Sequence, residues 1–123
     1  NRTKNIKNLL LDQKLVSGLG NIYVNEILFQ AKINPFKKSY LINLDENKRI
    51  VKYSKIILNK AIQYGGSSIR DFKGITGKSG NFQSEFKVYD RAKKRCRRNN
   101  CSGQINRKII SNRSTFVCSV CQK

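Results

Sequence analysis

The sequence predicts a mainly α-helical domain followed by a small β-hairpin zinc ribbon. Three observations support this fold class: apolar residues recur at helical spacing in the first half, two glycines mark a turn between two such segments, and all four cysteines lie near the C-terminus. We expect the helical domain to cover residues 1–90 and the ribbon to cover residues 91–123. No apolar stretch approaches the roughly 20 residues that span a bilayer, so no membrane contact is expected.

Three helices are expected in the helical domain. Residues 5–12 have the pattern of the end of a short helix. After a turn, Asn21 can cap a second helix, which should stop before Pro35 because the residue preceding a proline avoids the α region. A third amphipathic helix is expected from residues 43–45 to Tyr64, where two glycines end it.

The cysteine spacing predicts one structural Zn²⁺. A close pair, a gap long enough for a hairpin and a second close pair are typical of a tetrahedral zinc ribbon. Residues 104–110 and 114–117 are expected to be its strands, with residues 111–113 at the tip. Two disulfides in a secreted domain are the alternative, but no apolar leader precedes the segment. The expected ligands are Cys96, Cys101, Cys118 and Cys121.

The charge of the chain indicates a polyanionic partner. Lys and Arg number 26 against 7 Asp and Glu, which gives a formal net charge of +19. A surface of this kind usually binds nucleic acid, and an anionic membrane surface is a distant second. The chain contains no histidine, and its carboxylates form no convincing acid–base couple, so these residues alone do not indicate catalysis.

The turn over residues 13–20 is a candidate phosphate site. Its two glycines let the backbone approach a polyanion, and the N–H groups that begin the next helix favour a phosphate. A plain helix–helix turn, whose glycines only avoid steric conflict, explains the same pattern equally well. The expected DNA-contacting residues in this part of the chain are Arg2, Lys7, Lys14, Gly18, Gly20 and Asn21.

Two further features are candidates for nucleic-acid contact. Arg113, expected at the tip of a metal-supported hairpin, suits insertion into a groove, although a solvated arginine is the simpler interpretation. The glycine-rich loop 74–82 can either close over a ligand or form a plain connection.

Six segments, in order along the chain, carry a resemblance to a known family. They are Ile6-Lys7 and the motifs LLDQ (10–13), GLGNIY (18–23), GGSSIRDF (65–72), VYDR (88–91) and RSTFVCSVCQ (113–122). Together they resemble bacterial formamidopyrimidine-DNA glycosylase. The match covers essentially the whole chain and corresponds to the C-terminal half of that enzyme, a helix–two-turn–helix domain followed by a zinc finger.

The resemblance implies a bifunctional base-excision repair enzyme that acts on double-stranded DNA. Such an enzyme removes oxidised purines, such as 8-oxoguanine and formamidopyrimidines, and then nicks the strand at the abasic site by β,δ-elimination. Its nucleophile is an N-terminal proline with a neighbouring glutamate as acid. Neither is in this chain, which begins at Asn1, so we expect a fragment that is inactive alone.

The resemblance also assigns roles to residues of this chain. Lys7 and Asn21 fall on phosphate-binding positions, and Arg113 on the finger arginine that donates a proton in δ-elimination. The four cysteines fall on the zinc ligands. Residues 74–82 fall on the loop that covers the flipped damaged base. In that loop the expected contacts are Gly74, Thr76, Gly77, Gly80 and Phe82.

Two departures and two alternatives accompany this interpretation. The first cysteine pair is separated by four residues where many members have two, and Asn81 stands where an aromatic residue is common. An endonuclease VIII-like glycosylase fits the segment around residues 65–72 less well. A non-catalytic zinc ribbon of the ribosome or transcription machinery would also be basic. We expect a monomer located in the bacterial cytoplasm with the nucleoid.

Overall fold

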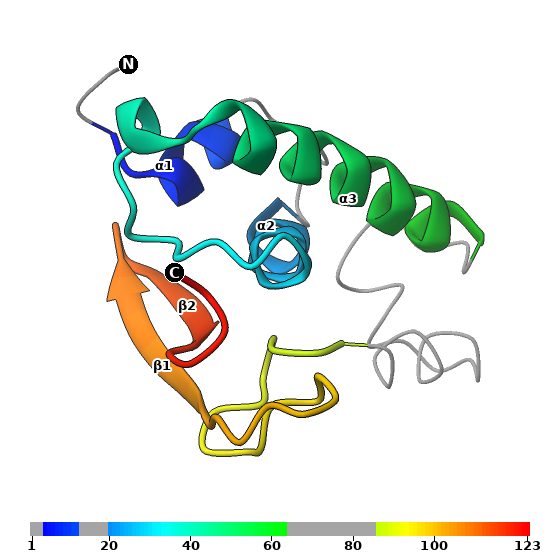
Figure 1. Ribbon diagram of the computed structural model, residues 1–123, viewed down its shortest axis with the longest axis vertical. Coiled ribbons are helices and arrows are strands. Elements are labelled where there is room, and N and C mark those ends of the chain that lie inside the picture. The colour runs from blue at the N-terminus through cyan, green and yellow to red at the C-terminus, as the bar shows by residue number, and fades with distance from the viewer. Residues whose placement is uncertain (1–3, 13–19, 64–85) are drawn as a thin grey trace.

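A computed structural model describes the backbone of residues 4–12, 20–63 and 86–123 of the chain. Its second helix occupies the centre, with α1 and α3 on one side and a two-stranded hairpin on the other (Figure 1). No helix in these described ranges is long and apolar enough to cross a membrane. The predicted fold class, a helical part followed by a hairpin with clustered cysteines, is confirmed. The elements are α1 (Ile6–Asp12), α2 (Gly20–Gln30), the 3-10 helix η1 (Ser39–Leu41), α3 (Leu44–Gln63), β1 (Ile105–Ile110) and β2 (Arg113–Cys118).

Local sequence explains where α2 ends and α3 begins. Lys32 adopts a left-handed conformation with φ 62°, and the N–H of Ile33 donates to the carbonyl of Leu28 at 3.0 Å, so α2 closes before the proline is reached. At the start of α3, the backbone N–H of Glu46 donates to the Asn43 side chain at 2.7 Å, and the Asn43 N–H donates back to the Glu46 carboxylate at 3.0 Å. This reciprocal capping box satisfies two N–H groups at the start of α3.

The helical core forms around α2, which is buried on nearly every side. Tyr23, Ile27 and Leu28 are at most 1% exposed, and Ile6 of α1 and Ile50 of α3 pack against the same cluster. In α3 only one side faces this core, because Val51, next to Ile50, is 47% exposed. The long third helix therefore covers α2 with one stripe and presents its basic remainder to solvent.

The hairpin has a shorter turn than the sequence predicts. Ile110 pairs with Arg113, which leaves only Ser111 and Asn112 in the turn. Both have positive φ, 50° and 65°, as a type I′ turn between twisted strands requires. The sequence predicted that Arg113 forms part of the tip, and this prediction is wrong. Arg113 is the first residue of β2.

A second core lies beneath the hairpin and includes a residue of α2. Phe29, near the end of α2, is 2% exposed and packs there. Because α2 belongs to both cores, the helical part and the hairpin share one element. The predicted boundary between two domains at residues 90 and 91 stays a prediction. The buried members of this second core are Phe29, Val88, Cys96, Cys101, Ile105, Phe116 and Cys118.

A buried carboxylate joins α2 to the segment that leads into the hairpin region. Glu26 is 5% exposed and accepts backbone N–H groups from Lys87 at 2.8 Å, Val88 at 3.0 Å and Tyr89 at 2.8 Å. Burial raises the pKa of the Glu26 carboxyl, while these three N–H groups act in the opposite direction. The sequence does not predict these contacts, because the partners of Glu26 lie 61 to 63 residues away.

We expect Glu26→Gln to destabilise the chain by about 3 kcal/mol, because the amide presents one acceptor and one donor group where three N–H groups converge. Urea unfolding of the zinc-loaded protein measures this. Asp90→Asn is the matched control, since Asp90 is exposed and asparagine tolerates its φ of 60°, so its effect should stay within about 0.5 kcal/mol. A Glu26→Gln effect as small as that of the control would contradict the role of this carboxylate.

Candidate metal centre and nucleic-acid interface

The side chains of the four cysteines form one cluster. Their sulfur atoms all lie within 4.8 Å of one another, with Cys96 and Cys121 at 3.9 Å and Cys101 and Cys118 at 3.7 Å. Tetrahedral zinc with Zn–S bonds of about 2.3 Å needs sulfur atoms about 3.8 Å apart. All four are free thiols, so the alternative of two disulfides does not fit. The cluster can bind a metal ion.

Backbone and side-chain hydrogen bonds hold the cysteines in place. The N–H of Cys96 donates to the carbonyl of Gly103 at 2.9 Å, and the N–H of Cys118 donates to the Gln122 side chain at 2.8 Å. Gln122 is 2% exposed, and its amide group donates in turn to the carbonyl of Ile33, just after α2, at 3.0 Å. The sequence does not predict these roles of Gly103 and Gln122. Gly103 depends on how the turn after Cys96 folds back, and Gln122 on Ile33, which lies 89 residues away.

The crowded thiols need a cation to ionise together. Burial, then the neighbouring cysteines, raises the pKa of Cys96, and the same causes raise the pKa of Cys121 to about 12. Burial acts the same way on Cys118, but the backbone N–H groups of Cys121 and Val120 lower its pKa overall. A divalent metal bound by the cluster would supply that positive charge and would keep the four sulfurs as thiolates.

Lys7 lies at the interface between α1 and the hairpin. Its side chain is fully buried, and its ammonium donates to the Thr115 hydroxyl at 2.7 Å and to the Ser114 carbonyl at 3.1 Å. Burial, and then the positive charge of Arg113, lowers the pKa of Lys7 to about 8. The ammonium is thus directed toward the backbone next to Arg113, and a direct phosphate contact by Lys7 stays a prediction.

Two asparagines of α2 meet the same part of the hairpin. The Asn21 amide group donates to the Ser114 carbonyl at 3.2 Å. The Asn25 amide group donates to the same carbonyl at 3.4 Å. Asn25 also accepts the backbone N–H of Phe116 at 2.8 Å, so its amide bridges two positions of β2. Lys7 and Asn21, two predicted contacts from separate segments, therefore donate to one carbonyl group, which belongs to the residue that follows Arg113.

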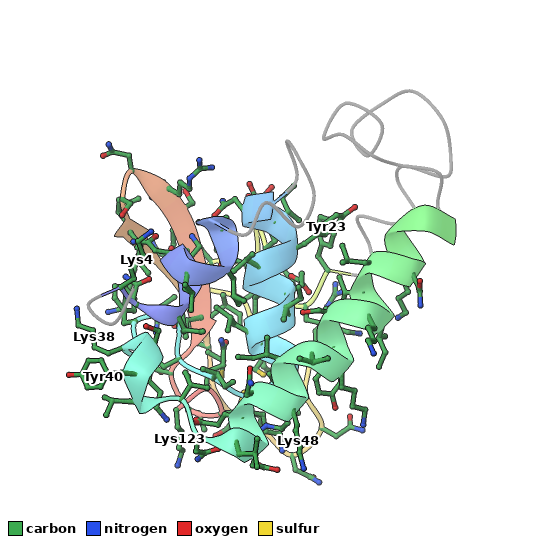
Figure 2. The ribbon with its side chains drawn as sticks, turned by 90° about the horizontal axis from the view of Figure 1, so that it is seen from above. Lys4, Tyr23, Lys38, Tyr40, Lys48 and Lys123 are labelled. Carbon is green, nitrogen blue, oxygen red and sulfur yellow. The ribbon has the colours of Figure 1, made fainter. Side chains whose placement is uncertain are left out.

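Basic side chains dominate the surface of the described part of the chain. Of the carboxylates in the described residues, Glu26 is buried against backbone N–H groups and pairs with no lysine there, whereas Glu46 forms an ion pair with Lys37 at 2.7 Å. Figure 2 shows Lys38, Lys48 and Lys123 at the periphery of the molecule. Arg113 is exposed at the start of β2. Such a distribution suits a polyanion.

The remaining predicted contacts fall into two groups. Gly20 begins α2, and a methyl group there would make only an ordinary contact, 3.6 Å from the Leu11 side chain. The others lie outside the described residues and stay predictions. They are Arg2, Lys14, Gly18, Gly74, Thr76, Gly77, Gly80 and Phe82.

The buried ammonium gives a pH prediction for Lys7→Met. The pKa of Lys7 is 10.5 when unperturbed and about 8 in the fold, so unfolding takes up a proton between these values. The free energy of unfolding of the wild type should therefore rise relative to the variant, by up to about 3 kcal/mol, between pH about 8 and about 10.5, and stay level below. Urea unfolding across this range tests it, with Lys48→Met, at an exposed position of α3, correcting for the lost charge. If the difference in free energy of unfolding between wild type and Lys7→Met does not change with pH, the Lys7 ammonium is exposed to solvent and the prediction is wrong.

Gly103→Ala should weaken metal binding. A Cβ atom at this position would lie 2.6 Å from the Cys118 sulfur and 3.0 Å from the Val120 Cβ, so a metal ligand or its turn must move. Strain of about 1–3 kcal/mol corresponds to a roughly 5- to 150-fold loss of zinc affinity, measurable by competition with a chelating dye. Ser102→Ala, at the exposed neighbouring position, should bind zinc as the wild type does. Equal affinities for all three proteins would refute the close approach.

Comparison with known proteins identifies the family. Residues 1–73 match the family model described as the formamidopyrimidine-DNA glycosylase H2TH domain. The formamidopyrimidine-DNA glycosylase of Roseobacter denitrificans is 47% identical over 123 residues, which cover all of this chain and 44% of that protein. The chain thus spans less than half the length of this relative.

Solved structures give the same result. A complex of Lactococcus lactis Fpg with abasic-site DNA is 40% identical, with a TM-score of 0.81, over 98% of this chain and 43% of that one. A structure of MutM with DNA containing carbocyclic 8-oxo-G is 38% identical, with a TM-score of 0.79, over 98% of this chain and 42% of that one. The chain therefore belongs to the formamidopyrimidine-DNA glycosylase family and corresponds to its H2TH domain and zinc-finger region.

Proposed function

We propose that this chain is the DNA-binding half of a bifunctional DNA glycosylase and abasic-site lyase. The whole enzyme would excise oxidised purines, 8-oxoguanine and formamidopyrimidines, in base-excision repair and nick the strand by β,δ-elimination. One observation carries the proposal: Lys7, Asn21 and Arg113, all predicted DNA contacts, converge on the start of β2 although Lys7 and Ser114 are 107 residues apart in sequence. The DNA-bound state of the solved relatives supports the same partner.

The metal in this proposal is one structural Zn²⁺ held by the four cysteines. A site of four thiolates with no open position favours zinc in a structural role. The ion would fix the base of the hairpin, and thereby the orientation of Arg113, without taking part in the reaction.

Each converging residue has a distinct proposed role. Arg113, exposed and charged, would enter the DNA and donate a proton during δ-elimination. Asn21, in the first turn of α2, would present its amide and nearby backbone N–H groups to a phosphate. Lys7 would act without touching the phosphate. Its buried positive charge would add to the electrostatic field at the phosphate, and its hydrogen bonds would hold the backbone beside Arg113.

The other parts of the proposal rest on the resemblance. Residues 74–82 would cover the flipped base, and the nucleophilic proline would come from the part of the family fold that this chain does not cover. These 123 residues alone would bind DNA without excising a base. We propose a monomer in the bacterial cytoplasm.

Fluorescence anisotropy of the zinc-loaded chain tests the partner. The titrants are a duplex with a central abasic-site analogue, the same undamaged duplex and an RNA hairpin. We expect both duplexes to bind more tightly than the RNA, and Arg113→Ala to weaken duplex binding by about tenfold and lower the salt slope by about one. Lys48→Ala, an exposed position of α3, controls for the lost charge and should have a smaller effect. Preference for the RNA hairpin would overturn the proposal in favour of a ribosomal zinc ribbon.

A further inference from the structure

Arg98 lies in the four-residue gap between the first two cysteines, and its guanidinium makes three specific contacts. One nitrogen donates to the Cys121 sulfur at 2.7 Å and another donates to the Phe29 carbonyl at 2.8 Å. The guanidinium carbon also stands 4.2 Å from the centre of the Phe29 ring. The Arg98 side chain, of a type that is mostly exposed, is therefore directed inward.

The three contacts share one chemical property, because each partner offers electron density to a cation. The Phe29 carbonyl lies in the last turn of α2, at the negative end of that helix, and its ring presents the face of its π-system. The Cys121 sulfur carries negative charge once it is a metal ligand. Only a planar, forked cation can serve the carbonyl, the ring and the sulfur at the same time.

Cys121 is also the cysteine most open to solvent. Cys96, Cys101 and Cys118 are buried, whereas Cys121 is only partly so. Cys121 and Arg98 both line a groove of about 500 Å³ between the start of α3 and the cysteine turns. The guanidinium therefore covers the sulfur that faces this groove.

We propose that Arg98 is a positioning residue of the metal centre, which holds the Cys121 thiolate on the ion and ties the centre to the end of α2. The inference rests on the proposed zinc site. A tetrathiolate zinc centre carries a net negative charge, and a hydrogen bond from a cation to one sulfur reduces both that charge and the sulfur's tendency to leave the metal. Because the same guanidinium holds Phe29, loss of the metal would also loosen the contact between the hairpin region and α2.

Alkylation by iodoacetamide tests this inference at the level of one atom. In this reaction the attacking sulfur forms a C–S bond, iodide leaves, and the zinc loses that ligand. The rate of zinc release is followed with a chromogenic chelator, and peptide mass spectrometry identifies the cysteine that reacts first. We expect Arg98→Met to release zinc about tenfold faster than wild type, with Cys121 modified first.

Two further variants keep the test decisive. Arg95→Met removes the same charge from an exposed position in the same segment and should release zinc at the wild-type rate. Arg98→Lys keeps the charge but cannot reach all three partners, so its rate of zinc release should lie between those of wild type and Arg98→Met. If Arg98→Met binds no zinc, the comparison of Arg98→Lys with wild type tests the proposal instead.

The outcomes separate this inference from the proposed metal. If the wild-type chain binds about one zinc ion and all four proteins release zinc at equal rates, the proposed role of Arg98 is wrong, while the proposed metal site stands. First modification at a cysteine other than Cys121 in the Arg98 variants would also overturn it. A wild-type chain that binds no zinc would instead refute the metal site on which the inference rests.

Discussion

The position of the hairpin depends on hydrogen bonds to one backbone carbonyl, that of Ser114. Lys7 of α1 and Asn21 and Asn25 of α2 all direct donors toward it. The hairpin has only two strands, and the core beneath it includes Phe29 of α2. Polar groups from the helices therefore act together with this shared core to orient the hairpin, and the residue immediately before Ser114 is Arg113.

The second helix transmits this orientation through the molecule. Its first turn holds Asn21, its middle holds Glu26 against residues 87–89, and its end places Phe29 in the hairpin core. Each turn of α2 therefore meets a different part of the chain. This explains why the helix is buried on nearly every side and why its amphipathic character is weak, since no face is left for solvent.

Features set by neighbouring residues could be predicted from the sequence, and features set by distant partners could not. The helices, the cysteine cluster and the hairpin follow from local spacing, and the family follows from motifs in order along the chain. Within the described residues two local features differ: the 3-10 helix η1 was not expected, and the hairpin turn has two residues where three were expected, because Ser111 and Asn112 both adopt positive φ. Glu26, Gln122 and Arg98 were missed because a charged or polar residue in the sequence carries no sign of the buried groups it will meet.

The pairing of Lys7 with the hairpin also has a consequence for how the protein is made. Lys7 and its two acceptors are separated by 107 and 108 residues, so its ammonium lacks these partners until β2 has been synthesised. At about 5–20 residues per second, a ribosome needs roughly 5–20 s to cover that distance. During this interval α1 lacks the part of its surroundings that buries the Lys7 ammonium, and its packing is complete only after β2 has emerged.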